Sequence, residues 1–250
     1  MEIQKTTGIV LSSVTLGEAD KIARIYTKEY GKRNFIFKGI KKSKRRPITV
    51  AEPGTISKLV YYFHEDKDIY LVNEFQIFKQ YFAIRNNFKK IVVLYFLLET
   101  AEKTSAYNDP NRSIFDLIVA GIDNLVKTEY LEHFSVFFIL HILRLNGILP
   151  DLNICKMCHR HDYDEFAIDL TDFYPICRNC SNSMKNNKML FHMRIKEYID
   201  LVLLQKYVSI NHSLFPVEDI LNLLFYLILF IESYFHVEIK SKNFILQKHY

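Results

Sequence analysis

The sequence predicts an α+β protein, with a small β-barrel at the N-terminus and a helical domain after it. Two observations support this class. Five of the seven glycines lie in the first 54 residues, between short segments rich in Ile, Val, Thr, Tyr and Phe. After Gln80 the chain changes to long segments in which apolar residues recur at three- and four-residue steps. We therefore expect residues 1–80 to form the β domain and residues 81–250 to form the helical domain.

The first domain is expected to contain five short strands, over residues 7–14, 21–27, 34–38, 55–63 and 69–78. In the last of them, polar Glu74 and Gln76 alternate with apolar Phe75 and Ile77, as in a strand with one buried face. Hairpin turns are expected near Gly31 and over residues 64–68. Five short strands in about 80 residues favour a closed barrel of the OB type, a fold that binds nucleic acid on one face.

The second domain is expected to be built from helices. They are predicted over residues 88–104, from Asp109-Pro110 to Lys127, and over residues 130–146, 193–207 and 217–235. The apolar run at residues 220–231 is shorter than the ~20 residues that a bilayer span needs, so we expect a buried core helix. The basic tail, residues 236–250, is expected to cover the domain or extend from it. Met1–Lys5 shows no secretory signal, which favours an intracellular protein.

All four cysteines lie in a polar stretch, as two matched pairs. Cys155-x2-Cys158 is followed, after eighteen residues, by Cys177-x2-Cys180. This spacing is typical of a zinc site. Four thiolates close the coordination sphere, so we expect a structural zinc that folds a knuckle of about residues 151–185. The alternatives are incidental buried thiols, two redox pairs, or His159 or His161 as substitute ligands.

Positive charge is concentrated in one segment. Residues 28–46 carry nine cations and one acid, 9 − 1 = +8, and since the whole chain carries +5, the rest sums to 5 − 8 = −3. Such asymmetry indicates local contact with a polyanion, although a solvated loop is the alternative. Phe35 and Phe37 share one face of a strand, where they either stack on bases or fill the core. The candidate nucleic-acid contacts are Lys32, Arg33, Lys38, Lys41, Lys42, Lys44, Arg45 and Arg46.

No catalytic motif was found in the sequence. The phosphate-binding loop G-x-x-x-x-G-K-[ST], G-x-S-x-G and H-E-x-x-H are all missing. A zinc deaminase needs an H-x-E motif besides its cysteine pair, and His159-Arg160-His161 lacks the acid. We therefore expect a binding protein that is not an enzyme and has no catalytic residues.

Three stretches of the sequence together resemble a known family. The first runs from Gly8-Ile9-Val10-Leu11 through Gly17-Glu18-Ala19-Asp20-Lys21-Ile22 and Thr27-Lys28-Glu29-Tyr30-Gly31-Lys32 to Lys38-Gly39-Ile40-Lys41-Lys42. The second joins Gly147-Ile148-Leu149-Pro150-Asp151-Leu152 to the cysteine pairs, and the third is Tyr234-Phe235-His236-Val237 with Lys240-Ser241-Lys242. In this order and spacing they resemble RecO, the bacterial DNA repair and recombination mediator. The sequence departs from the family at Thr171–Pro175, where a glycine-rich stretch is common, and at Val237-Glu238, where Leu-Gly is usual.

The resemblance implies an N-terminal OB fold and a helical domain with a structural zinc. It also implies binding of single- and double-stranded DNA and annealing of complementary strands. The implied partners are RecR, the acidic C-terminal tail of single-stranded DNA-binding protein and, indirectly, RecA. The implied location is the bacterial cytoplasm at the nucleoid, with no membrane contact. Lys38, Lys41 and Lys42 match the basic end of the OB motif. The alternatives are a zinc-containing RNA-binding or transcription-associated module, and a scaffold that binds no nucleic acid.

Overall fold

The computed structural model describes residues 2–149, 151–161, 165–170, 172–183 and 188–246. The chain forms two compact units. The barrel unit combines residues 1–131 with residues 239–249, and the second unit comprises residues 132–238. The compact units are therefore divided at a different place from the expected boundary at residue 80, because three helices and the C-terminal segment pack with the barrel.

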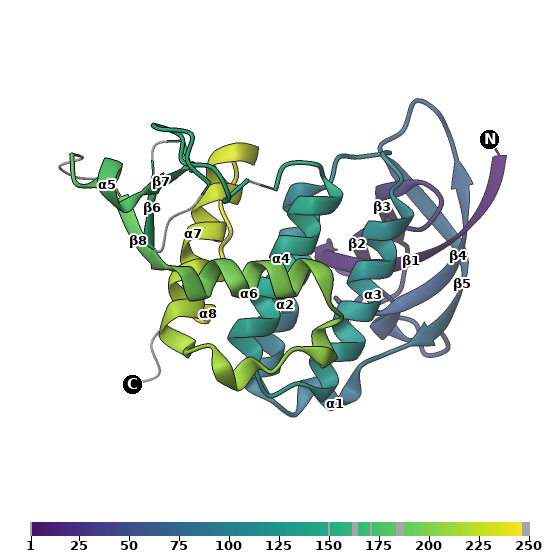
Figure 1. Ribbon diagram of the computed structural model, residues 1–250. Coiled ribbons are helices and arrows are strands. Elements are labelled where there is room, and N and C mark those ends of the chain that lie inside the picture. Colours follow the sequence, from purple (N-terminus) through teal and green to yellow (C-terminus); the bar gives the residue numbers. More distant parts are fainter. Residues whose placement is uncertain (1, 150, 162–164, 171, 184–187, 247–250) are drawn as a thin grey trace. The chain divides into compact units, whose positions relative to one another are not determined.

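Five strands close the barrel of the first unit (Figure 1), as the sequence predicts. Their order is β1-β2-β3-β5-β4, and β4 pairs with β1 to close the ring. β3 and β5 form a parallel pair, whereas the other pairs are antiparallel. The strands are β1 (Glu2–Leu16), β2 (Asp20–Thr27), β3 (Gly31–Phe37), β4 (Ile56–Phe63) and β5 (Ile69–Lys79).

The barrel core combines aliphatic side chains with several aromatic rings. Phe35 and Phe37 are at most 1% exposed, and Phe35 packs edge-on against Tyr61 at 5.0 Å between ring centroids. The two phenylalanines therefore fill the core, and the hypothesis that they stack on bases is wrong. The alternation of side chains along a strand correctly predicted that Phe35 and Phe37 share one face. In a closed barrel, that face is the interior.

Helices cover part of the barrel within the first unit. After η1 (Ile48–Ala51) come α1 (Phe82–Arg85), α2 (Phe88–Thr104) and α3 (Arg112–Lys127), and α8 (Lys242–Ile245) returns from the C-terminal segment. Asn87 caps α2 by accepting a hydrogen bond from the Lys90 backbone N–H at 3.1 Å, and Asn111 caps α3 in the same way. These caps fix where the two helices begin, and the predicted bounds of residues 88–104 match α2.

The second unit combines helices with a small sheet. Its helices are α4 (Leu131–Leu145), α5 (Arg178–Ser181), α6 (Met193–Leu204) and α7 (Val217–Phe235), with the short η2 (Tyr207–Ser209) and η3 (His212–Leu214). The apolar face of α7 is buried, as expected for a core helix. No helix among the described residues is long and apolar enough to cross a membrane.

A three-stranded antiparallel sheet accompanies the cysteines and was not predicted. Its order is β7-β6-β8, from β6 (Glu165–Asp169), β7 (Pro175–Cys177) and β8 (Lys188–His192). Strands of three to five residues are too short to show an alternating pattern. The fold class is nevertheless α+β, as the sequence predicts.

Candidate metal centre and nucleic-acid interface

The four cysteines of the second unit converge on one point. Cys155 and Cys158 come from a turn, Cys177 ends β7, and Cys180 lies in α5. Their sulfur atoms all lie within 4.8 Å of one another. The Sγ atoms of Cys158 and Cys177 are 3.7 Å apart. Four sulfurs at about 2.3 Å from one zinc ion would be separated by about 3.8 Å, so the cluster could hold a metal ion of this size.

Backbone hydrogen bonds shape the first cysteine turn. The N–H of His159 donates to the Cys155 carbonyl at 2.8 Å, and the N–H of Cys155 donates to the Arg160 carbonyl at 2.9 Å. His159 adopts a left-handed backbone, with φ of 58°, which costs a non-glycine residue of order 1 kcal/mol. The turn therefore bends around the sulfurs in spite of some strain.

The thiols of the cluster differ in acidity. Burial raises the pKa of Cys155, but N–H groups of Cys177, Cys158 and Met157 point at its sulfur and outweigh burial, which leaves the pKa at about 6. Hydrogen bonding with the Cys177 sulfur, together with burial, raises the pKa of Cys180 to about 12. One sulfur thus loses its proton easily and a neighbour resists, because neighbouring thiolates repel one another. A divalent cation would remove this repulsion.

No histidine in the described part of the chain joins the cluster of ligand atoms. The group that could bind a metal contains the four cysteines, whereas His159 and His161 are exposed. An H-x-E spacing does occur in the chain, at His236-Val237-Glu238, directly after α7. His236 is likewise exposed and outside the cysteine group, so the described residues do not assemble the deaminase arrangement.

Six of the eight candidate cations lie on one loop of the barrel unit, residues 38–46, which we call the basic loop. It follows β3 and is held against the β1–β2 turn. The N–H of Lys41 donates to the Ala19 carbonyl at 2.9 Å, and the N–H of Gly39 donates to the Asp20 carboxylate at 2.7 Å. These bonds fix the backbone of the loop while its long side chains point outward.

Most cations of the basic loop are available to a ligand. Exposed side chains are those of Lys38, Lys41, Lys42, Lys44 and Arg45, whereas Arg46 is half-buried. Lys42 pairs with Glu18 at 2.8 Å, and the Arg46 guanidinium donates to the Lys38 carbonyl. Among the described residues, the other cations of the loop form no ion pair. The loop therefore offers concentrated positive charge to solvent.

Lys32 and Arg33 have structural roles instead. Lys32 is 7% exposed, its ammonium donates to the Glu102 carbonyl at 2.6 Å, and it lies 4.5 Å from the centre of the Tyr107 ring. Burial lowers the pKa of Lys32, although the Glu102 carboxylate acts in the opposite direction. Its inclusion among the candidate nucleic-acid contacts is therefore corrected: Lys32 does not belong there, because a buried ammonium cannot reach a phosphate.

Arg33 is held within the barrel unit by several partners. Its guanidinium lies 4.4 Å from the centre of the Tyr30 ring and donates to the Tyr61 hydroxyl at 2.8 Å and to Asn108 at 2.9 Å. These contacts tie β3 to β4 and to the loop before α3. Arg33 is a weaker candidate for phosphate contact than the basic loop.

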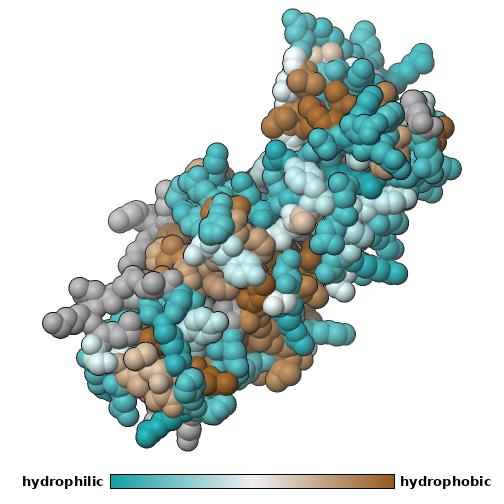
Figure 2. All heavy atoms as spheres, turned by 90° about the horizontal axis from the view of Figure 1, so that it is seen from above, coloured by the Kyte–Doolittle hydropathy of each residue, from teal (hydrophilic) through white to brown (hydrophobic). Residues whose placement is uncertain are grey.

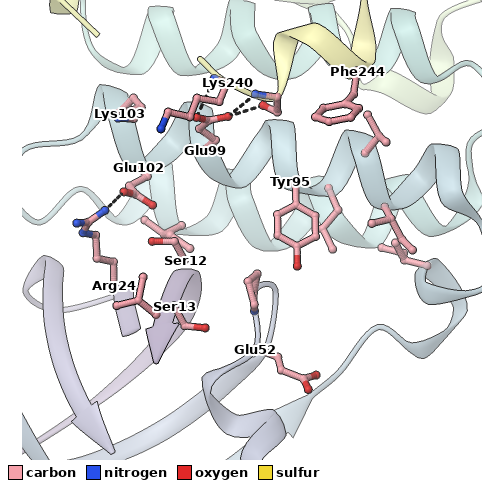
Figure 3. Close-up of a pocket in the computed structure, with 18 of the residues that line it drawn as sticks. Ser12, Ser13, Arg24, Glu52, Tyr95, Glu99, Glu102, Lys103, Lys240 and Phe244 are labelled. Carbon is pink, nitrogen blue, oxygen red and sulfur yellow. Dashed lines mark hydrogen bonds and ion pairs between the residues drawn. The ribbon is translucent and has the colours of Figure 1, made fainter. Parts of the chain in front are cut away.

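A groove in the same unit was not predicted from the sequence. Its volume is about 880 Å³, and we call it the α2 groove because residues of α2 form one wall (Figure 3). β1 and β2 line the facing side, and Lys240, Ser241 and Phe244 line the upper edge. Its lining includes Val14, Lys21, Arg24, Tyr95, Lys103 and Phe244. These residues are spread over most of the chain, so no local motif marks them.

Two family models match nearly the whole chain. The model described as Recombination protein O N terminal matches residues 1–81, and the model described as Recombination protein O C terminal matches residues 85–243. The chain belongs to the RecO family. The boundary between the two matches falls where the sequence changes from strands to helices.

Curated RecO proteins are similar over 70–99% of the chain. The DNA repair protein RecO of Caldanaerobacter subterraneus subsp. tengcongensis is 21% identical over 99% of both chains. That of Thermoanaerobacter sp. is 25% identical over 98% of both chains. That of Exiguobacterium sibiricum is 30% identical over 70% of both chains. The chain is thus a DNA repair protein of the RecO family.

Proposed function

We propose that this protein binds DNA strands through the basic loop and brings complementary strands together during recombinational repair. The exposed cations of the loop are the observation that supports this most strongly. Each cation placed on a phosphate releases condensed counterions, which favours binding without sequence preference. By lowering the repulsion between two strands, the loop would hold them together long enough for base pairing to begin. The protein would act by binding, without catalysis.

We further propose that the cysteine cluster binds one Zn²⁺ with a structural role. Cys155, Cys158, Cys177 and Cys180 would occupy all four tetrahedral positions, leaving none for water or substrate. The metal would hold together β6–β8 and the cysteine turns. From membership of the RecO family we also propose its partners, RecR and the acidic C-terminal tail of single-stranded DNA-binding protein. Through them, the protein would assist the loading of RecA. Such work would place the protein at the nucleoid in the bacterial cytoplasm.

The salt dependence of DNA binding tests the proposed role of the basic loop. A variant with Lys41, Lys42, Lys44, Arg45 and Arg46 changed to Ala should bind single-stranded DNA more weakly. The slope of log K against log salt should become shallower by about 3.5, because each lost phosphate contact contributes roughly 0.7. Fluorescence anisotropy of a labelled oligonucleotide at several salt concentrations measures the slope.

A matched variant and two further mixtures complete this experiment. The control removes five exposed lysines of the barrel unit outside the loop: Lys5, Lys58, Lys67, Lys89 and Lys127. If the control flattens the slope as much as the loop variant does, the loop has no special role. Addition of a complementary strand tests annealing. Strong preference for competitor RNA over DNA would instead favour an RNA-binding module. If the wild-type protein bound no nucleic acid, the remaining interpretation would be a scaffold.

A further inference from the structure

The α2 groove begins where the basic loop begins. Lys21 lines the groove and pairs in register with Phe37 in the β2–β3 ladder, and Lys38 is the first residue of the basic loop. A flexible chain of phosphates held on the loop therefore has a short path into the groove. Arg24 lies on the same strand as Lys21 and also lines the groove.

The carboxylates of the groove are already engaged. Glu102 pairs with Arg24, and Glu52 pairs with Arg85. Glu99 accepts hydrogen bonds from the backbone N–H groups of Lys240 and Ser241, at 3.0 and 2.9 Å, and from the Ser241 hydroxyl at 2.5 Å. These contacts also attach the C-terminal segment to α2.

Three cations of the groove are left for a ligand. Lys21, Lys103 and Lys240 form no ion pair with another described residue. The groove contains five cations and three acids, so its net charge is 5 − 3 = +2. Figure 3 shows Arg24, Lys103 and Lys240 gathered towards one end. Its chemistry therefore suits an anion that also carries apolar or aromatic surface.

Two aromatic rings lie farther along the groove. Tyr95 extends from α2 into the groove, and Phe244 comes from α8 on its upper edge (Figure 3). Tyr95 is 49% exposed and Phe244 is 61% exposed. Exposed rings beside cations are the combination by which single-stranded nucleic acids are bound, since bases stack on rings while lysines contact phosphates.

We propose that the α2 groove binds single-stranded nucleic acid and continues the path that starts at the basic loop. Bases stack on Tyr95 and Phe244, and phosphates contact Lys21, Lys103 and Lys240. The inference rests on the proposed DNA-binding function and adds a site that discriminates between strands. The basic loop attracts any phosphate chain, whereas the groove accepts bases that are not paired. An acidic peptide with apolar side chains is the competing occupant; continuity with the basic loop favours the nucleic acid.

Binding by aromatic variants tests this proposal. Tyr95→Ala and Phe244→Ala should each weaken binding of single-stranded DNA by about 5- to 150-fold, as expected for the loss of one stacked base. Binding of duplex DNA should change less than about two-fold, because paired bases are already stacked and cannot stack on these rings. Phe88→Ala is the matched control, because Phe88 is a 73% exposed ring of the same helix that does not line the groove. Thermal unfolding of each variant confirms that it is folded.

Photochemical crosslinking of the wild-type protein gives an independent measurement. Single-stranded DNA with 5-iododeoxyuridine at successive positions should crosslink to Tyr95 or Phe244, and mass spectrometry of the digested adduct identifies the residue. Crosslinks confined to the basic loop, together with full affinity of the Tyr95→Ala/Phe244→Ala variant, would overturn the groove proposal and leave the basic-loop function intact.

Two further outcomes separate the possible failures. A labelled acidic peptide ending in apolar residues is titrated against the same variants. If they lose peptide binding but keep single-stranded DNA binding, the groove is a peptide site and the proposal is wrong. If the wild-type chain binds no DNA at all, the proposed function fails together with the groove.

Discussion

Glycine at position 31 is required by both conformation and space. Gly31 has a φ of 69°, and a Cβ atom there would lie 2.3 Å from the Asp109 carbonyl oxygen, well inside contact distance. Gly17 has a similar φ of 57°, but a Cβ atom there meets no atom within 4 Å. The two positions therefore share backbone strain and differ in packing.

We predict that Gly31→Ala destabilises the protein more than Gly17→Ala does. The left-handed conformation should cost each variant about 1 kcal/mol. Overlap with Asp109 should cost Gly31→Ala about 1–3 kcal/mol more, because the backbone must move. Urea unfolding followed by circular dichroism measures both, since the chain has no tryptophan for fluorescence. Equal losses of unfolding free energy in the two variants would mean that the loop around Asp109 moves aside at little cost.

Phe173 adopts a left-handed backbone conformation although it is not a glycine. Its φ is 64°, in the stretch just before the second cysteine pair. Its ring packs edge-on against Phe230 at 5.5 Å, and Tyr226 donates a hydrogen bond to its carbonyl at 3.1 Å. Packing against α7 thus offsets the strain that a glycine would avoid.

At the scale of elements, we predict that the cysteine knuckle depends on a bound metal ion for its order. The strands β6–β8 have three to five residues each, too few for an independent sheet. We predict one zinc per chain by elemental analysis. Removal of the metal by a chelator should speed amide hydrogen exchange in β6–β8 and leave β1–β5 unchanged.

Substitution in the knuckle supplies the control for this prediction. Cys158→Ser should lose most of the zinc, whereas Met157→Ser, an exposed neighbour, should keep it. Unchanged exchange in β6–β8 after chelation would show that the sheet folds without metal.

Buried histidines on α4 and η3 make the second unit sensitive to acid. Burial lowers the pKa of His133 and His212 below the ordinary 6.5, although hydrogen bonds to the carbonyls of Phe215 and Tyr207 act in the opposite direction. The unfolded chain therefore binds more protons than the native one below about pH 6.5. The contribution to stability is present above that pH and is lost as the pH falls through it.

We predict that the free energy of unfolding decreases between pH 7.5 and pH 5. Each of these histidines should contribute at most about 1.4 kcal/mol per pH unit. A His133→Gln/His212→Gln variant should be less stable at pH 7.5 but show a shallower pH dependence. Exposed His64→Gln serves as the control. Urea titrations at several pH values test this, and an unchanged slope in the double variant would contradict it.

At the scale of the whole molecule, the sequence predicts repeated patterns better than distant contacts. α2 and α7 match their expected bounds because their apolar periodicity and flanking residues are local. The cysteine cluster follows from a spacing that has few geometric solutions. Lys32 was misassigned because alternation shows that it points out of the barrel but not that α2 covers it there.

The α2 groove lay beyond sequence reasoning for a similar reason. Its walls come from segments as distant as Val14, Tyr95 and Phe244, and no spacing rule connects them. On the face drawn in Figure 2, apolar patches interrupt a mostly hydrophilic surface, and such surface features arise only from the folded arrangement.

The return of residues 239–246 to the barrel unit also affects when that unit is completed during translation. A ribosome adding ~5–20 residues per second needs roughly 5 to 20 s to add residues 132–238 after the first segment of the unit. During this interval Glu99 lacks the backbone donors of Lys240 and Ser241, and the α2 groove lacks its upper edge. A nascent chain beside its own messenger RNA would therefore carry an unfinished groove, and the groove would form only after the second unit had been synthesised.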